Sequence, residues 1–167
     1  MDALPAPNAP IGIFDSGLGG LTIVRALQQR LPAEALHYIG DTAHLPYGDK
    51  SPETLHSYIR PIVWALRAVP VKAIVIACNT ASAVAAQVVR QEAGPLPVYE
   101  VIAPAVAQAV AQAPGGRIGV IGTKTTVASG VYRQQLLAAN PQAQVLQKAT
   151  PLLVPLIEEG WEKRPVA

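Results

Sequence analysis

The stretch Ile11-Gly-Ile-Phe-Asp-Ser-Gly-Leu-Gly-Gly-Leu21 carries the clearest fold signal in this chain. It opens with a short apolar run, typical of a buried strand, and its glycines permit a tight turn before a helix. A segment of helical spacing and composition follows over Leu21–Leu31. Strand, glycine turn and helix in this order make the first part of a βαβ unit, in which the next strand runs parallel to the first.

The same alternation continues along the chain. Further apolar runs predict strands at Leu36–Ile39, Ala73–Ala77, Val98–Ile102, Ile118–Ile121 and Val145–Leu146. Further stretches predict helices at Ser51–Val69, Ala81–Gln91, Pro104–Ala111 and Ser129–Ala139. The first of these opens with Ser51-Pro-Glu53, which supplies an N-cap, a proline at the first helical position and an acid in the first turn. We therefore predict an α/β fold with a parallel-sheet, flavodoxin-like βαβ lobe.

A proline-rich link at Gly94-Pro-Leu-Pro97 predicts a seam between two lobes. We expect residues 1–97 to form a first α/β lobe and residues 98–167 to form part of a second, similar lobe. Pro151–Glu159 predicts the beginning of another helix, and the sequence stops soon after it. We therefore expect the second lobe to be truncated, with a sheet edge or a helix face left uncovered.

The composition excludes several classes of protein. Hydrophobic residues make up 50% of the 167 residues and charged residues 14%, which disfavours disorder. The net charge is only +2 and the basic residues are scattered, so no nucleic-acid partner is expected. A single cysteine excludes an internal disulfide and a four-cysteine zinc site. Without a membrane-length apolar run or a signal-peptide pattern, we expect a cytoplasmic protein and no membrane partner.

Polar residues follow the first and third predicted strands, at the edge where open parallel sheets bind ligands. Asp15-Ser16 follows the first strand, and Cys78-Asn79-Thr80 follows the third. If the strand order is 2-1-3, these strands are neighbours, and Asp15 and Cys78 face each other across one cleft. The alternative for Asp15 is an ordinary capped turn between a strand and a helix.

Cys78 stands at the predicted start of a helix. Exposed amides and the helix dipole lower a thiol pKa at such a position, whereas the nearby Asp15 carboxylate opposes ionisation. Such a pair suits a thiol that exchanges protons, and we expect Cys78 to be accessible to small thiol reagents. The alternative is a buried, inert cysteine.

Two more loops carry candidate binding residues. The loop that begins at Gly40 contains Pro46-Tyr-Gly48, which predicts a turn that presents backbone amides and a hydroxyl. Gly122–Thr126 either binds an anion through hydroxyls and amides or caps a helix. The first loop also holds side chains able to ligate a metal, but their spacing is too irregular to predict a site: Asp41, His44 and Asp49.

Several strings of residues resemble the cofactor-independent glutamate racemases of the aspartate/glutamate racemase superfamily. They occur in the family's order and span nearly the whole chain. Each string alone is a weak signal, but their combination is specific. The strings are Asp15-Ser-Gly-Leu-Gly-Gly-Leu21, Gly40-Asp-Thr-Ala-His-Leu-Pro-Tyr-Gly48, Ala77-Cys-Asn-Thr-Ala81, Gly119-Val-Ile-Gly-Thr123 with Thr126, and Pro151-Leu-Leu-Val-Pro-Leu-Ile-Glu-Glu-Gly160.

The resemblance implies racemisation of L- and D-glutamate by two cysteines, one on each face of the α-carbon, with no cofactor and no metal. The product D-glutamate would serve peptidoglycan synthesis. Cys78 matches the family's first catalytic cysteine, and Asp15 matches the acid that assists it. The resemblance implies glutamate as the partner and leaves a homodimer as a possible assembly. The family's substrate-binding positions match Ser16, Tyr47, Gly48, Asn79, Thr80, Thr123 and Thr126.

The family's second cysteine lies in a Gly-Cys-Thr-His string that this sequence lacks. The resemblance therefore implies the N-terminal portion of a racemase, with half of the active site and no activity on its own. Two other functions stay open: a thiol hydrolase with Cys78 as nucleophile and His44 as base, and a non-catalytic or regulatory protein that binds a small acid or a partner. The absence of a second cysteine disfavours a redox role.

Overall fold

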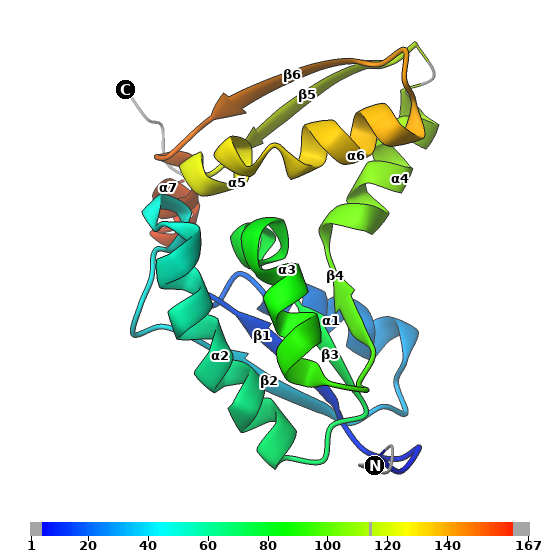
Figure 1. The fold of residues 1–167 in the computed structure, drawn as a ribbon, viewed down its shortest axis with the longest axis vertical. Helices are drawn as coiled ribbons and strands as arrows, with labels where there is room; N and C mark the ends of the chain where they lie inside the picture. The colour runs from blue at the N-terminus through cyan, green and yellow to red at the C-terminus, as the bar shows by residue number, and fades with distance from the viewer. Residues whose placement is uncertain (1–4, 114, 162–167) are drawn as a thin grey trace.

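The computed structural model describes residues 5–113 and 115–161, and its larger part is a four-stranded parallel sheet (Figure 1). The strand order is β2-β1-β3-β4, and Phe14 pairs with Ile39 on one side and Ile76 on the other. The predicted α/β fold and the 2-1-3 order are both confirmed. The strands are β1 (Ile11–Asp15), β2 (Leu36–Gly40), β3 (Ala73–Ile76) and β4 (Val98–Glu100).

Helices cover both faces of this sheet. On one face, α1 (Leu21–Arg30) packs against Ile11 and Ile13 of β1. On the other face, α2 (Pro52–Ala68) and α3 (Asn79–Ala93) enclose the larger apolar core, which contains Phe14. Successive side chains of β1 thus point to opposite faces, as the pleat of a strand requires.

The second part of the molecule is smaller. β5 (Arg117–Gly122) and β6 (Gln144–Ala149) pair in parallel, and α4 (Ile102–Gln112) and α6 (Val131–Ala139) share a small apolar core with them. The short helix α5 (Lys124–Ser129) faces α3, and α7 (Leu153–Glu158) follows β6. In the described part of the chain, no element covers the outer face of β5 and β6 (Figure 1).

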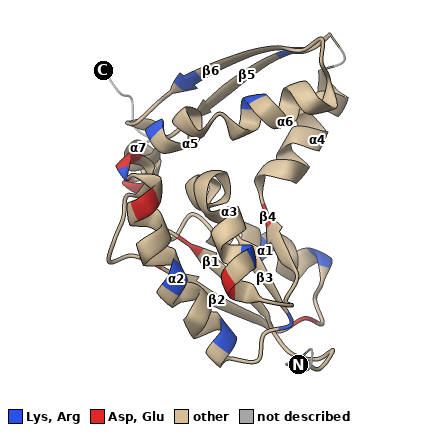
Figure 2. Ribbon diagram, in the orientation of Figure 1, with Lys and Arg blue, Asp and Glu red and all other residues tan. Residues whose placement is uncertain are grey.

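Charged residues lie on both parts, and Lys and Arg are spread over helices and strands (Figure 2). This distribution matches the scattered spacing of the basic residues along the sequence.

Several predicted boundaries differ from the structure, and α3 and α4 begin at Asn79 and Ile102, two residues before their predicted starts. The predicted strand Val98–Ile102 ends at Glu100, because the Glu100 carboxylate accepts hydrogen bonds from the amides of Ile102 and Ala103 and so starts α4. The predicted helix Ser129–Ala139 begins only at Val131, since Gly130 with φ 69° ends α5. β6 is longer than the predicted Val145–Leu146.

The strand expected to open the second lobe, β4, pairs with β3 and completes the first sheet. The division of the chain at residue 97 stays a prediction. Parts of both predicted lobes, residues 1–4 and 162–167, lie outside the described residues.

Candidate active site

A cavity of about 440 Å³ opens at the carboxyl ends of β1 and β3. The loop after β2 forms a second wall, and the start of α1, Val101, the start of α5 and the segment Pro151–Glu158 also line the cavity. Every predicted site residue except Thr126 lines this cavity. The predicted residues that line it are Asp15, Ser16, Tyr47, Gly48, Cys78, Asn79, Thr80 and Thr123.

Asp15 caps the turn between β1 and α1. Its Oδ2 accepts hydrogen bonds from the amides of Gly17 at 3.1 Å and Gly20 at 2.9 Å. A Cβ at Gly20 would lie 2.6 Å from the Asp15 Cβ, so this close approach requires glycine. The ordinary capped turn is therefore present, and the same carboxylate is buried at the wall of the cavity.

Cys78 is the N-cap of α3 and faces Ser16 across the end of the sheet. Its thiol donates to Ser16 Oγ at 3.5 Å and accepts a hydrogen bond from the Ala81 amide at 3.4 Å. The neighbouring strands place it there, because the Ala77 amide donates to the Phe14 carbonyl at 2.8 Å.

The expectation that Cys78 is accessible is wrong, and of the opposing effects predicted for its pKa, those that raise it are the larger. The residue is only 6% exposed, and this burial raises the thiol pKa above its ordinary value. Hydrogen bonds with Ser16 and the Ala81 amide oppose the increase, while the charge of Asp15 adds to it. Cys78 is therefore a protonated thiol at neutral pH, at the wall of a cavity.

Hydroxyl groups join the two parts of the molecule beside the cavity. Thr80 Oγ1 lies 3.0 Å from Thr123 Oγ1 and 3.3 Å from Thr126 Oγ1, and the Thr123 hydroxyl donates to Thr126 at 2.9 Å. Thr123 is also the N-cap of α5 and accepts from the Thr126 amide. The capping role predicted as one alternative for Gly122–Thr126 is thus present. Thr126 does not line the cavity, and its hydroxyl lies within hydrogen-bond distance of the other two threonines.

The Tyr47 hydroxyl was predicted to be presented for binding, but it is bonded to another residue of the loop. It donates to Asp41 Oδ2 at 2.6 Å, and the residue is 2% exposed. Tyr47 and Gly48 both line the cavity, and Gly48, which has no side chain, lines it with its backbone. Gly48 lies against Thr123, where an added Cβ would be 2.5 Å from the Thr123 Cγ2.

His44 does not line the cavity. Its Nδ1 lies 2.8 and 2.9 Å from the two Asp41 carboxylate oxygens, and its ring stacks on Tyr58 at 4.1 Å. The hydrolase alternative needs a histidine beside Cys78, and the partners of the thiol are Ser16 and Ala81 instead. Among residues 5–113 and 115–161, no group of three His, Cys, Asp or Glu is arranged to hold a metal ion.

Sequence reasoning did not single out Glu158, which reaches the cavity from α7. Its Oε1 would lie 4.0 Å from a Cβ added at Gly17, so a second carboxylate faces the turn that Asp15 caps. Lys124, at the start of α5, brings a cation to the same wall. No sequence pattern predicts that Glu158 or Lys124 lines the cavity. Their positions depend on how the second part of the molecule packs on the first.

Within the described ranges, no helix has the length and apolarity that a membrane span requires.

A family model described as Asp/Glu/Hydantoin racemase matches residues 19–165. The chain belongs to this family. A glutamate racemase of Neisseria meningitidis is 51% identical over 152 residues, which are 91% of this chain and 56% of that protein. A glutamate racemase of Picosynechococcus is 54% identical over 149 residues, 89% of this chain and 52% of that protein.

Solved racemase structures of this family share the fold. The glutamate racemase of Francisella tularensis, solved in complex with D-glutamate, has a TM-score of 0.83 and 41% identity over 92% of this chain and 57% of that chain. The glutamate racemase of Bacillus anthracis has a TM-score of 0.88 and 38% identity, and covers 94% of this chain and 59% of that chain. The chain thus spans somewhat more than half the length of the relatives it matches.

Proposed function

We propose that this chain is part of a glutamate racemase and supplies one of its two catalytic thiols, Cys78. The observation that carries the proposal is the shared cavity of Cys78 and Asp15 at the ends of neighbouring parallel strands. The named relatives support glutamate as the substrate. A role in peptidoglycan synthesis, a cytoplasmic location and the absence of a cofactor are part of the proposal and rest on the resemblance.

Inversion of an α-carbon needs a base on one face and an acid on the other. With D-glutamate, the Cys78 thiolate takes the α-hydrogen as a proton, and a second thiol on the opposite face gives a proton to the carbanion. With L-glutamate the roles exchange, and the Cys78 S–H group donates. Each turnover in either direction therefore uses Cys78 once.

The resting state of Cys78 is the thiol, so when substrate binds the thiol must first lose its proton to bulk water to become the base. The α-ammonium group of an amino acid brings a positive charge beside Cys78 and Asp15, which lowers a thiol pKa. The Ser16 hydroxyl and the Ala81 amide are already within hydrogen-bond distance of the sulfur and stabilise its charged form. Asp15 has both of its capping bonds in place and assists as a fixed negative charge near the ammonium group.

Substrate carboxylates require hydrogen-bond donors, and the cavity wall offers several. The Asn79 Oδ1 accepts a hydrogen bond from the Tyr132 hydroxyl at 2.6 Å, which leaves the Asn79 Nδ2 as a donor. The Thr80 and Thr123 hydroxyls satisfy each other in this structure and can turn to donate to a carboxylate. The backbone of Gly48 also lines the cavity.

The second thiol is not present in this chain, whose one cysteine is Cys78. The test is a chimera in which the part of the Neisseria meningitidis relative beyond the matched region is fused to this chain. We expect racemisation without pyridoxal phosphate, metal or nucleotide, with exchange of the α-hydrogen for deuterium from heavy water. The 167-residue chain alone is expected to be inactive.

In the chimera, Cys78→Ser should abolish turnover in both directions, because a hydroxyl is a far weaker acid than a thiol. Asp15→Asn should have a milder effect, since Asp15 does not touch the carbon. Ser57→Ala, on the outer surface of α2, is the matched control and should leave turnover unchanged. Circular dichroism of glutamate over time measures the rates. Full turnover by Cys78→Ser would contradict the proposal, and glutamate binding without deuterium exchange would favour a non-catalytic binding protein.

A further inference from the structure

Asp41 lies just outside the cavity and is fixed to the strand that carries Asp15. It follows β2, and its amide donates to the Asp15 carbonyl at 2.9 Å. Its side chain is 10% exposed. The backbone of Asp41 is therefore fixed at the edge of the sheet by this hydrogen bond. Its carboxylate can accept hydrogen bonds from the loop that follows.

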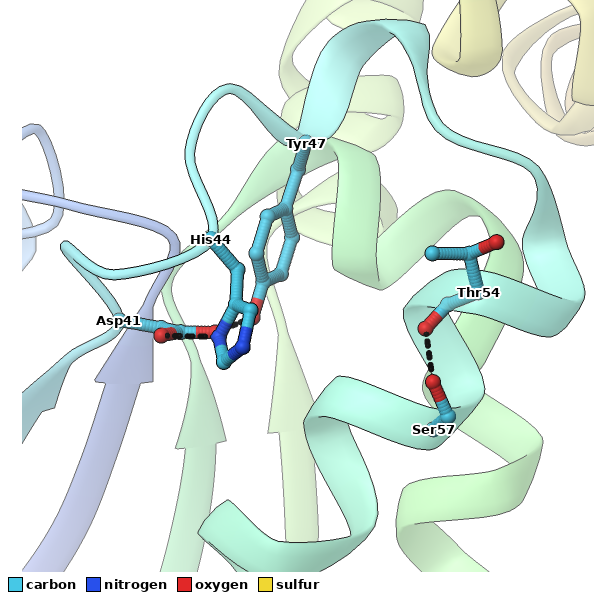
Figure 3. Close-up of polar contacts among 5 residues, drawn as sticks. All are labelled: Asp41, His44, Tyr47, Thr54 and Ser57. Atoms are coloured by element: carbon cyan, nitrogen blue, oxygen red, sulfur yellow. Dashed lines mark hydrogen bonds and ion pairs between the residues drawn. The ribbon is translucent and has the colours of Figure 1, made fainter.

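The Asp41 carboxylate holds two side chains of that loop (Figure 3). It accepts from the Tyr47 hydroxyl at 2.6 Å and pairs with His44 Nδ1 at 2.8 Å. The Tyr58 ring of α2 stacks on His44 and lies tilted against the Tyr47 ring, with centroids 6.2 Å apart. Because the Tyr47 hydroxyl is buried, it needs this acceptor. We call these four residues, Asp41, His44, Tyr47 and Tyr58, the Asp41 cluster.

The loop held by the Asp41 cluster forms a wall of the cavity and touches the second part of the molecule. Gly48 is in contact with Thr123 with no space for a methyl group. Two residues further on, the Lys50 carbonyl accepts from the Thr125 hydroxyl at 2.8 Å. The loop is thus fixed on one side by the Asp41 cluster and on the other by α5. Tyr47 and Gly48 are consecutive residues, so the hydrogen bond that holds Tyr47 to Asp41 also restrains the backbone that contacts Thr123.

We propose that Asp41 is a positioning residue, which acts through Tyr47 to set the place of the Tyr47–Gly48 backbone in the cavity wall. Asp41 itself does not line the cavity. Its effect on a bound D-glutamate rests on the proposed function, whereas its effect on the place of Gly48 does not.

The test uses the 167-residue chain, labelled with nitrogen-15, and the variants Asp41→Ala, Asp41→Asn and Tyr47→Phe. Glu92→Gln is the matched control, since this carboxylate also accepts from an aromatic side chain, Trp64 Nε1 at 2.9 Å, but on the outer surface of α2 and α3. All measurements are made well below the melting temperature of each variant. They are the amide chemical shifts of Gly48 and Thr123 and the dissociation constant for D-glutamate.

Asp41→Ala should shift both amides and weaken D-glutamate binding roughly ten-fold, because the Tyr47 hydroxyl loses its acceptor. Asp41→Asn keeps an oxygen that accepts from Tyr47 and should recover most of the affinity. Glu92→Gln should change neither quantity. The double variant Asp41→Ala/Tyr47→Phe should be no worse than the worse single variant, because both act through one bond.

A lower melting temperature for Asp41→Ala with unchanged amide shifts and unchanged affinity would show a merely structural role and overturn the proposal. Additive losses in the double variant would overturn the route through Tyr47. If Asp41→Ala does not fold, the amide shifts and the dissociation constant are measured for Asp41→Asn and Tyr47→Phe instead. Unchanged values in Tyr47→Phe would then overturn the proposal. Shifted amides in a chain that does not bind D-glutamate at all would support the positioning role and contradict the proposed substrate.

Discussion

Gly48 and Thr123 are in contact in the wall of the cavity, although Gly48 lies in the loop after β2 and Thr123 follows β5. A Cβ at Gly48 would lie 2.5 Å from Thr123 Cγ2 and 2.6 Å from Thr123 Cβ. Real Cβ atoms do not approach so closely, so one of the two segments would have to move. The loop and α5 can therefore make this contact only with glycine at residue 48.

Gly48→Ala should therefore separate the loop from α5 and destabilise the chain by about 1–3 kcal/mol, the usual result of overpacking. D-Glutamate binding should weaken at the same time. Gly119→Ala is the matched control, because a Cβ there has no atom within 4 Å, and it should change the free energy of unfolding by less than about 0.5 kcal/mol. Urea unfolding measures both variants. Equal stability of the two variants would contradict the contact.

A second prediction concerns the start of α2. Ser51 Oγ accepts a hydrogen bond from the Thr54 amide at 3.2 Å, and Ser51→Ala removes this cap. The loss should be about 1 kcal/mol in the free energy of unfolding. Ser57→Ala is the control, since the Ser57 hydroxyl donates to a carbonyl inside the same helix and caps nothing. A loss of equal size in both variants would show that the cap has no special role.

The start of α2 was predictable because its signals are local. Ser51-Pro-Glu53 carries the cap, the first helical proline and the first-turn acid within consecutive residues. The meeting of Asp15 and Cys78 was predictable for a different reason. Parallel strands end at the same edge of a sheet, so residues that follow neighbouring strands come together once the order is known.

The burial of Cys78 could not be predicted from its own surroundings in the sequence. A helix start predicts a lowered thiol pKa, but tertiary packing leaves the residue 6% exposed and reverses the sign. The same holds for Glu158, which reaches the cavity only because α7 packs there. The bond between Tyr47 and Asp41 follows no helical or strand periodicity, so no spacing indicated it.

The outer face of β5 and β6 leads to a third prediction. Leu146 is 79% exposed and Ile121 is 65% exposed, on a parallel sheet of a kind that is usually covered on both faces. We expect the chain to self-associate through this face, and Leu146→Lys to reduce the association without loss of stability. Val145→Lys is the contrast, because Val145 points into the core at 6% exposure and its substitution should unfold this part. Sedimentation velocity measures the association, and a wild-type chain that stays monomeric would refute it.

A fourth prediction concerns alkaline pH. Because burial raises the pKa of Cys78, the folded state favours the thiol more strongly than the unfolded state does. This contribution to stability is complete below the ordinary thiol pKa of about 8.5 and is lost as the pH rises through the raised value. Tyr38, with a pKa raised to about 12, also lowers the free energy of unfolding as it ionises, but only at higher pH than Cys78. The free energy of unfolding should therefore begin to fall above about pH 8.5, and Cys78→Ser should remove this first decline.

The thiol also responds to its two neighbours with opposite signs. The Asp15 charge raises the pKa of Cys78, whereas the hydrogen bond with Ser16 lowers it. Asp15→Asn keeps an oxygen that can accept from the Gly17 and Gly20 amides but removes the charge, so the thiolate fraction should rise and iodoacetamide should alkylate Cys78 faster at pH 8. Ser16→Ala removes the bond to the sulfur, so alkylation should become slower.

Alkylation of a buried thiol also depends on how often the structure opens, so the rate alone does not decide between these causes. The pH dependence does, because a change in opening scales the rate at every pH, while a change in pKa moves the midpoint of the profile. The midpoint should fall in Asp15→Asn and rise in Ser16→Ala, and all variants should react alike in denaturant. Parallel profiles with a common midpoint would mean that neither neighbour controls the proton on Cys78, and the proposed proton transfer by this thiol would lose its physical basis.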